Sequence, residues 1–181
     1  MKKVFILFIT ILCFFPSNCS AYKNEPNGFR DLYWGESLQE VQKRHPDAKY
    51  DEYHSNENAI SYIIEFNNPY VSNVLANKER GIKIYFWNNK LYRIKFYFKS
   101  DMLLNLNANY IRLQDAMTLN FGNPTINNIV DTKNQQTYTA WQGFKTTIIL
   151  FKDINQHSIE VSLVNLNLMN KAIKDVALKG W

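Results

Sequence analysis

Cysteine, glycine and proline are all scarce in this chain of 181 residues, with two, six and five copies. Both cysteines, Cys13 and Cys19, lie within the first 21 residues. If that segment is removed, the remaining chain has no disulfide, no thiolate nucleophile and no cysteine ligand for a metal. The scarcity of glycine and proline excludes collagen-like and low-complexity classes. We therefore expect residues 22–181 to be held together by an apolar core alone, for which about 160 residues suffice.

Charge of one sign is scarce as well. The formal net charge is +5, of which Lys2 and Lys3 supply two, so residues 22–181 carry +3. This mild basic bias does not indicate nucleic-acid binding. Phosphate-binding loops, dinucleotide fingerprints and a serine in a Gly-x-Ser-x-Gly elbow are all absent from the sequence. We therefore predict no catalytic residue, no cofactor and no nucleic-acid partner.

The one long hydrophobic run covers residues 4–15, directly after Lys2 and Lys3. It is followed by the small residues Cys19, Ser20 and Ala21. A run of about 12 residues falls short of the ~20 that a spanning helix needs, but it fits the apolar region of a secretory signal peptide. We predict that residues 1–21 are a signal peptide cleaved after Ala21. The protein is then periplasmic or secreted and has no transmembrane segment after cleavage; the alternative is a lipid anchor at Cys19.

Periodicity predicts the elements of a first half. Ser37 and Glu40 form a capping box at the start of a short helix that Pro46 ends. Residues 59–66 alternate between apolar and polar, which is typical of a half-buried strand. Residues 82–87 and 91–98 predict a β-hairpin. A three-residue loop at residues 88–90 keeps its apolar side chains on one face, with the pairs Ile82–Phe96, Ile84–Ile94 and Phe86–Tyr92.

A second half repeats the pattern of helix then strands. Residues 109–121 have a helical apolar stripe that Gly122 ends. Strands are predicted at 137–141, 144–151 and 157–164, followed by a terminal helix at 166–178. We therefore predict an α+β fold: two helix-plus-antiparallel-meander halves, at about 28–99 and 107–164, form one layered domain over residues 22–181 with a C-terminal helix.

Two segments carry a resemblance to known families. Residues 34–41 (WGESLQEV) resemble a Gly-x-Ser/Thr-x-x-x-Val helix start, and residues 121–124 (FGNP) resemble a Gly-x-Pro helix end. These motifs are similar to those of small exported bacterial proteins built from tandem helix-plus-meander units, namely the SmpA/BamE family of outer-membrane-assembly lipoproteins and the β-lactamase-inhibitor-like fold. The resemblance implies a non-enzymatic envelope or extracellular module that binds another protein.

The outer face of the first hairpin is the candidate binding site. The predicted register places Lys83 opposite Lys95, and Tyr85 opposite Arg93. Trp87 then lies opposite Leu91, and Tyr97 continues the same face. Tryptophan and tyrosine beside arginine are typical of contact surfaces. The hypothesis is that this face docks an acidic envelope or extracellular protein, or an anionic polymer. The alternatives are a solvated sheet face, or a face covered by the terminal helix.

Acidic residues and histidines cluster near residue 50. His45, Asp47, Asp51 and His54 are close in sequence, but their spacing matches no strong ligand motif. Hydrophilic turns collect such residues by chance, so we predict an exposed loop and no metal site.

Two alternative functions stay open. An envelope hydrolase needs paired carboxylates, for which Glu65 and Asp131 are candidates although nothing in the sequence selects them. A structural subunit would dock through the terminal helix. That alternative predicts an apolar stripe exposed in the isolated domain, formed by Leu166, Met169, Ile173 and Val176.

Overall fold

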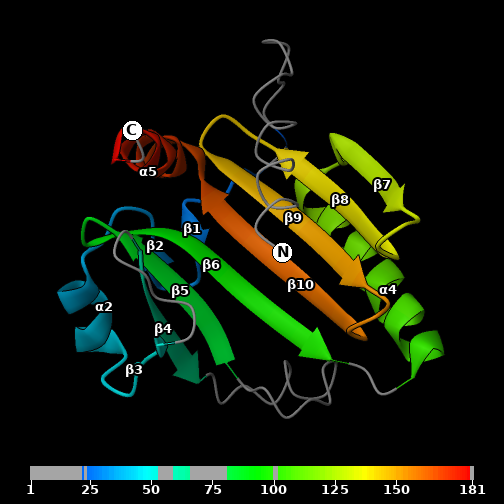
Figure 1. Cartoon of the computed structure of the whole chain (residues 1–181), viewed down its shortest axis with the longest axis horizontal. Helices are drawn as coiled ribbons and strands as arrows, with labels where there is room; N and C mark the ends of the chain where they lie inside the picture. The colour runs from blue at the N-terminus through cyan, green and yellow to red at the C-terminus, as the bar shows by residue number, and fades with distance from the viewer. Residues whose placement is uncertain (1–21, 23, 53–58, 66–80, 100–101, 180–181) are drawn as a thin grey trace.

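The computed structural model describes residue 22 and the ranges 24–52, 59–65, 81–99 and 102–179. These residues form an α+β fold with one large antiparallel sheet and a C-terminal helix, which confirms the predicted fold class (Figure 1). In chain order the elements are β1 (Gly28–Phe29), β2 (Leu32–Tyr33), α2 (Leu38–Arg44), β3 (Lys49–Tyr50), β4 (Ile60–Glu65), β5 (Gly81–Trp87), β6 (Lys90–Lys99), α4 (Leu103–Phe121), β7 (Ile126–Asp131), β8 (Gln136–Gln142), β9 (Thr146–Asp153), β10 (Ser158–Asn165) and α5 (Leu166–Lys179).

The large sheet joins two meanders at its centre. Its strand order is β3-β4-β5-β6-β10-β9-β8-β7, and β6 pairs with β10 in antiparallel fashion. Each meander follows a helix, α2 in the first half and α4 in the second. Core residues of β6 and β10 lie side by side, with Phe96 opposite Val161 and Ile94 opposite Leu163. Helices α2 and α4 both pack on the face of the sheet that carries these core side chains, so they cover one face. The opposite face carries the remaining side chains of the strands.

The first hairpin has the predicted register along most of its length and differs at its tip. Ile82 pairs with Phe96, and Ile84 with Ile94, as expected. The predicted pair of Phe86 with Tyr92 is wrong, since Phe86 pairs with Leu91 and Trp87 with Lys90. The turn therefore has two residues, Asn88 and Asn89, both with positive φ as a type I′ turn requires. A register shift after Tyr85 supplies the extra residue, so the apolar face stays continuous.

Capping residues and apolar stripes account for the bounds of helices α2 and α4. At α2, the Ser37 hydroxyl accepts from the Glu40 backbone N–H, and the Glu40 carboxylate accepts from the Ser37 backbone N–H, so the predicted capping box is confirmed. Gly122 caps α4 with a φ of 86°. Yet α4 begins at residue 103 rather than 109, because buried Leu106 extends the apolar stripe by another turn. Strand β7 was not predicted, since most of its residues are exposed and show no alternation.

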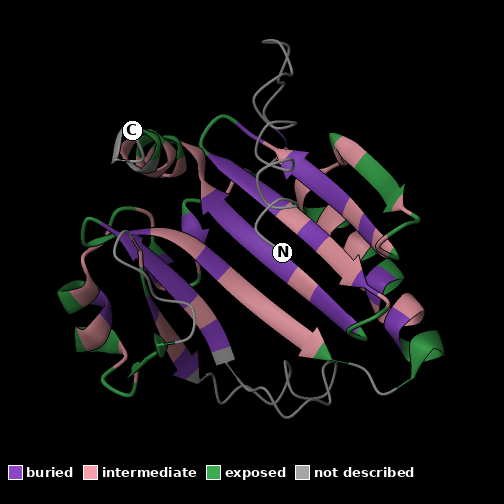
Figure 2. Ribbon diagram, in the orientation of Figure 1, coloured by how far each residue is buried: buried purple, intermediate pink, exposed green. Residues whose placement is uncertain are grey.

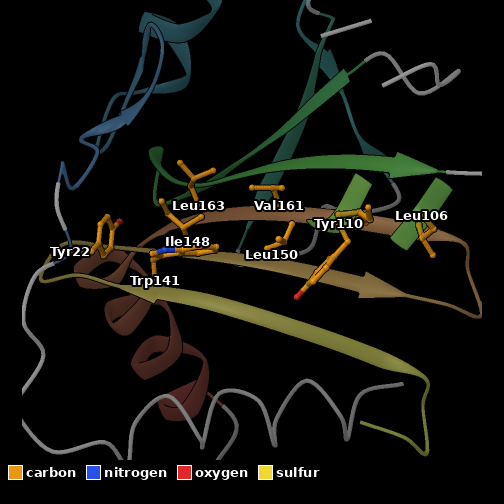
Figure 3. Packing of buried hydrophobic residues seen from close by; sticks show 9 residues of the cluster. Tyr22, Leu106, Tyr110, Trp141, Ile148, Leu150, Val161 and Leu163 are labelled. Atoms are coloured by element: carbon orange, nitrogen blue, oxygen red, sulfur yellow. The ribbon is translucent and has the colours of Figure 1, made fainter. Parts of the chain in front are cut away.

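Two apolar clusters fill the space between the sheet and its helices. One lies in the second half, under α4, and includes Trp141, Leu150 and Leu163; Figure 3 shows how its side chains converge from α4 and the strands. The other lies under α2 and includes Val41 and Ile84. Phe29, Trp34 and Phe96 pack against both clusters, so they join the two halves into one core.

Residue 22 and residues 24–34 link the two halves. The Tyr22 ring is buried against Phe121, and its hydroxyl donates to the Thr146 carbonyl. The Glu25 carboxylate accepts from the backbone N–H of Thr146 at 2.6 Å. The Trp34 indole N–H donates to the Thr146 hydroxyl at 2.9 Å. The core of the second half therefore includes residues that precede α2 in the chain.

Candidate functional site

Strand alternation places four charged or aromatic side chains on the face away from the helices. Lys83 and Tyr85 of β5 lie opposite Lys95 and Arg93 of β6, as predicted. The neighbouring strand β10 adds two polar residues on this face, because Ser162 lies opposite Lys95 and Glu160 opposite Tyr97. We call this set the charged face; it comprises Lys83, Tyr85, Arg93, Lys95, Glu160 and Ser162. Figure 2 shows that these strands have both buried and half-buried positions.

One carboxylate serves two cations at the centre of the charged face. The Lys95 ammonium lies 2.8 Å from Glu160 Oε1, while an Arg93 terminal nitrogen lies 3.7 Å from the same oxygen. Arg93 also donates from Nε to the Ser162 hydroxyl at 3.0 Å. Ser162 is almost fully buried, so the guanidinium has little freedom to rotate. Glu160 thus holds the two cations in a fixed arrangement across the β6–β10 pair.

A second carboxylate lies at the other side of the face. Asp51 follows β3 and donates its backbone N–H to the carbonyl of Ser61 on β4. Its side chain is buried, with Oδ2 3.8 Å from the Lys83 ammonium. Together with Arg93, Lys95 and Glu160, these groups amount to three cations and two carboxylates. At the centre of the face, the two cations Arg93 and Lys95 share the single carboxylate of Glu160 in partly buried surroundings.

Burial changes the protonation chemistry of two groups on the charged face. The pKa of Lys95 falls to about 8, first because burial disfavours the ammonium and second because Arg93 is close. Glu160 opposes both effects but does not cancel them. The pKa of the Tyr85 hydroxyl rises to about 12, mainly because burial disfavours the phenolate. Lys95 therefore loses its charge at a lower pH than an ordinary lysine does.

Of the aromatic residues in the predicted site, Tyr85 lies against the cations Arg93 and Lys95. Tyr85 and Trp87 expose only 7% and 9% of their surface, so their rings offer little area to a partner. The Arg93 guanidinium carbon lies 5.7 Å from the centre of the Tyr85 ring, within range of a cation–π interaction. Trp87 lies opposite Lys90 rather than the predicted Leu91. Tyr97 is half-buried and donates its hydroxyl to the Gln156 side chain at 3.4 Å.

No family model, no curated protein and no solved structure matches this chain. Within the described part of the chain, no helix is long and apolar enough to cross a membrane.

The described residues that were considered for a metal do not form a common site. His45 Nε2 lies 3.0 Å from Asp31 Oδ2, whereas Asp51 faces Lys83 on the other side of the sheet. His54 lies outside the described residues. Among the residues that the structure describes, no three acids, histidines or cysteines gather as a metal site would require.

The two carboxylates considered for hydrolysis have different surroundings. Asp131 ends β7, and its carboxylate accepts from the backbone N–H and the side chain of Asn134. These hydrogen bonds hold the pKa of Asp131 below its usual value, which suits a turn-stabilising carboxylate rather than a general acid. Glu65 ends β4, and its side chain lies outside the described part of the structure.

The terminal helix α5 lies at one end of the sheet and contacts β6 and β10 (Figure 1). Its Leu166, Met169 and Ile173 are half-buried, and the Val176 side chain lies outside the described residues. The stripe is thus covered in part by the domain itself.

Sequence reasoning missed Glu160 and Ser162 as members of the charged face, and it missed the contact of Asp51 with Lys83. The alternation of residues 157–164 already turned Glu160 away from the core, so a signal for it existed. Its contact with Lys95 depends on β10 pairing with β6, which joins residues 65 positions apart in the chain. Local patterns do not specify that pairing.

Proposed function

We propose that this chain is an exported, non-catalytic binding module that recognises an acidic partner protein through the charged face. The observation that carries the proposal is that two cations, Arg93 and Lys95, share one carboxylate, Glu160. A positive excess in a partly buried frame attracts anionic groups more strongly than the same charges in water. The prediction of export rests on residues 1–21, and the resemblance to exported helix-plus-meander proteins supports a binding role.

The rigidity of the face favours recognition over mere attraction. Arg93 is held by Ser162 and Glu160, and Lys95 by Glu160, so the side chains lose little entropy when a ligand arrives. A carboxylate of the partner would bind beside Arg93 and Lys95. Glu160 uses only some of the N–H donors of these two side chains, so others are left for the ligand. An acidic loop or strand with side chains on alternate positions matches this spacing along a sheet face.

The first test uses a variant with a neutral face: Arg93→Gln, Lys95→Gln and Glu160→Gln together. This change removes a net charge of one and leaves no unpaired ion at the centre of the face. The matched control is Lys133→Gln, which removes the same net charge at an exposed turn. Poly-glutamate serves as an acidic polypeptide probe and dextran sulfate as an anionic polymer probe, with binding followed by calorimetry at low ionic strength.

We expect the native protein and the Lys133→Gln control to bind poly-glutamate alike, and the neutral-face variant to bind at least about tenfold more weakly. The same three proteins are then used as baits against the envelope fraction of the producing cell. One protein retained by the native bait and the control, but lost from the neutral-face bait, supports the proposal. Equal binding by all three, or a preference for dextran sulfate alone, contradicts it.

A further inference from the structure

Two strongly exposed apolar side chains lie at the end of the sheet where residue 22 packs. Phe144, in the turn between β8 and β9, exposes 66% of its surface, and Leu119, in the last turn of α4, exposes 83%. The Tyr22 ring lies edge-on to Phe121 of α4, and its hydroxyl donates to the carbonyl of Thr146 at the start of β9. Residue 22 therefore contacts the two elements that carry these exposed side chains.

The position of the chain at this end is fixed by close contacts. The Glu25 carboxylate accepts from the backbone N–H groups of Lys145 and Thr146. A side chain at Gly143 would overlap the Glu25 carboxylate, so this approach requires glycine. The chain thus enters the domain directly beside Phe144.

The sequence before residue 22 connects this end of the domain to a membrane. Residues 16–21 separate the hydrophobic run at 4–15 from Tyr22, and a stretch of this length spans at most about 25 Å. A signal peptide lies in the bilayer through its apolar run, and an acyl group on Cys19 would lie there too. With either attachment, the end of the domain that carries Tyr22 and Phe144 is the end held closest to the lipid headgroups.

The exposed charges at this end are complementary to an anionic surface. Lys145 is exposed in the turn between β8 and β9, and its carbonyl accepts from the Leu166 N–H at the start of α5. Figure 1 shows α5 and this turn at the same end of the sheet. Among the described side chains of α5, two exposed lysines and one half-buried acid carry charge: Lys171, Lys174 and Asp175. Anionic headgroups attract lysines that are exposed in this way.

We propose that this end of the domain binds an anionic phospholipid surface. Phe144 and Leu119 enter the headgroup layer, and Lys145 contacts the lipid phosphates. An aromatic ring and an aliphatic side chain lose their contact with water there, which favours binding. Two such side chains alone give weak and reversible binding, and attachment of the chain near residue 22 strengthens it by raising the effective concentration.

The lipid-binding end is separate from the charged face. Phe144 and Lys145 precede β9 in a turn, whereas Arg93 and Lys95 lie within β6, two strands away in the sheet. The lipid contact does not depend on the function proposed for the charged face. Because its test uses vesicles and no acidic protein, either proposal can fail without the other.

Vesicle sedimentation measures this binding directly. The protein used is residues 22–181, which contain every residue that the structure describes. Vesicles of equal parts phosphatidylglycerol and phosphatidylcholine are compared with vesicles of phosphatidylcholine alone. We expect the partition coefficient to be at least about tenfold higher for the anionic vesicles. The preference should fall as salt is added, because salt screens the attraction between lysines and headgroups.

Matched variants locate the contact. Phe144→Ser, Leu119→Ser and Lys145→Gln each change one side chain at the lipid-binding end. Leu104→Ser is the control for Leu119→Ser, since Leu104 is 77% exposed in the first turn of the same helix. Lys133→Gln is the control for Lys145→Gln, because it lies in the turn at the opposite end of β8. All five positions are exposed, so we expect the fold to be retained, and thermal unfolding checks this.

Each of the three variants should lower the partition coefficient at least about threefold, whereas the two controls should bind as the native protein does. The neutral-face variant Arg93→Gln/Lys95→Gln/Glu160→Gln should also keep its vesicle binding. A native protein with no preference for anionic vesicles overturns the proposal. So do equal losses in variants and controls, or a loss in the neutral-face variant with none in Phe144→Ser.

Discussion

At the scale of single residues, Lys95 combines burial, a charged partner and a position at the centre of the charged face. Its ammonium is held by Glu160, yet its pKa is lowered to about 8 because desolvation outweighs that ion pair. A buried lysine lowers the free energy of unfolding while it is charged. In the function that we propose, Lys95 binds the acidic partner.

The first prediction concerns this lysine and pH. In the unfolded chain Lys95 holds its proton up to a pKa of 10.5, but in the folded chain it releases the proton near pH 8. Between about pH 8 and pH 10.5 the unfolded state binds more protons at Lys95 than the folded state does. The contribution of Lys95 to the free energy of unfolding therefore rises with pH. The shift corresponds to a rise of roughly 3 kcal/mol. Tyr85, whose pKa is raised from 10.0 to about 12, opposes this trend only above pH 10.

Urea denaturation of the native protein and of Lys95→Met, from about pH 7 to pH 10, measures the effect. The difference in free energy of unfolding between the two proteins should change steadily over this range in favour of the native protein. A difference that stays constant with pH would show that Lys95 titrates as an exposed lysine does. The same loss of charge should weaken binding to poly-glutamate above pH 8 in the native protein.

At the scale of elements, the first hairpin combines a two-residue turn with a register shift. A two-residue turn on its own would pair Ile84 with Arg93 and mix the two faces of the sheet. The structure uses that turn together with a register shift after Tyr85, so Leu91 and Ile94 both reach the core. The extra residue also brings Arg93 beside the Tyr85 ring. The bulge therefore keeps the core intact and completes the charged face at the same time.

The second prediction separates the two asparagines of this turn. Both have positive φ, a conformation that glycine adopts without strain. The Asn89 side chain also accepts from the Leu38 backbone N–H, which caps α2, whereas Asn88 has no such contact with α2. We expect Asn88→Gly to leave stability unchanged or slightly raised. Asn89→Gly should be about 1 kcal/mol less stable than Asn88→Gly, because it loses this hydrogen bond.

Thermal unfolding of the two glycine variants gives this difference directly. Equal stability of Asn88→Gly and Asn89→Gly would mean that water replaces the Asn89 side chain at the start of α2 without cost.

At the scale of the whole molecule, two similar halves share one sheet and one seam. The seam consists of the β6–β10 pair, residue 22 with residues 24–34, and Phe96, which packs on both core clusters as Phe29 and Trp34 do. Trp34 is the residue that both packs on each cluster and donates a hydrogen bond across the halves, to Thr146. Because the two clusters meet at this seam, we expect both halves to unfold together.

The third prediction tests the seam with neighbouring aromatic residues. Trp34→Ala should lower the free energy of unfolding by about 3 kcal/mol, because it removes a ring packed on two clusters and leaves the Thr146 hydroxyl without its donor. Tyr33→Ala is the control, since this ring is 48% exposed; it should cost less than about 1 kcal/mol. Denaturation is followed by tryptophan fluorescence and by circular dichroism. A similar loss in both variants would show that Trp34 does not join the halves.

Sequence patterns by themselves determined the capping box of α2, the glycine end of α4, the alternation of the strands and the face on which Lys83, Tyr85, Arg93 and Lys95 lie. These features depend on residues a few positions apart. They therefore follow from the 3.6-residue period of helices and the 2-residue period of strands. Only the tertiary structure decided that Glu160 and Asp51 join the cations, that Tyr85 and Trp87 are buried, and that α4 keeps an uncovered apolar side. Each of these depends on which distant strands pair and what covers them, and that choice minimises the free energy of the whole chain rather than of any segment.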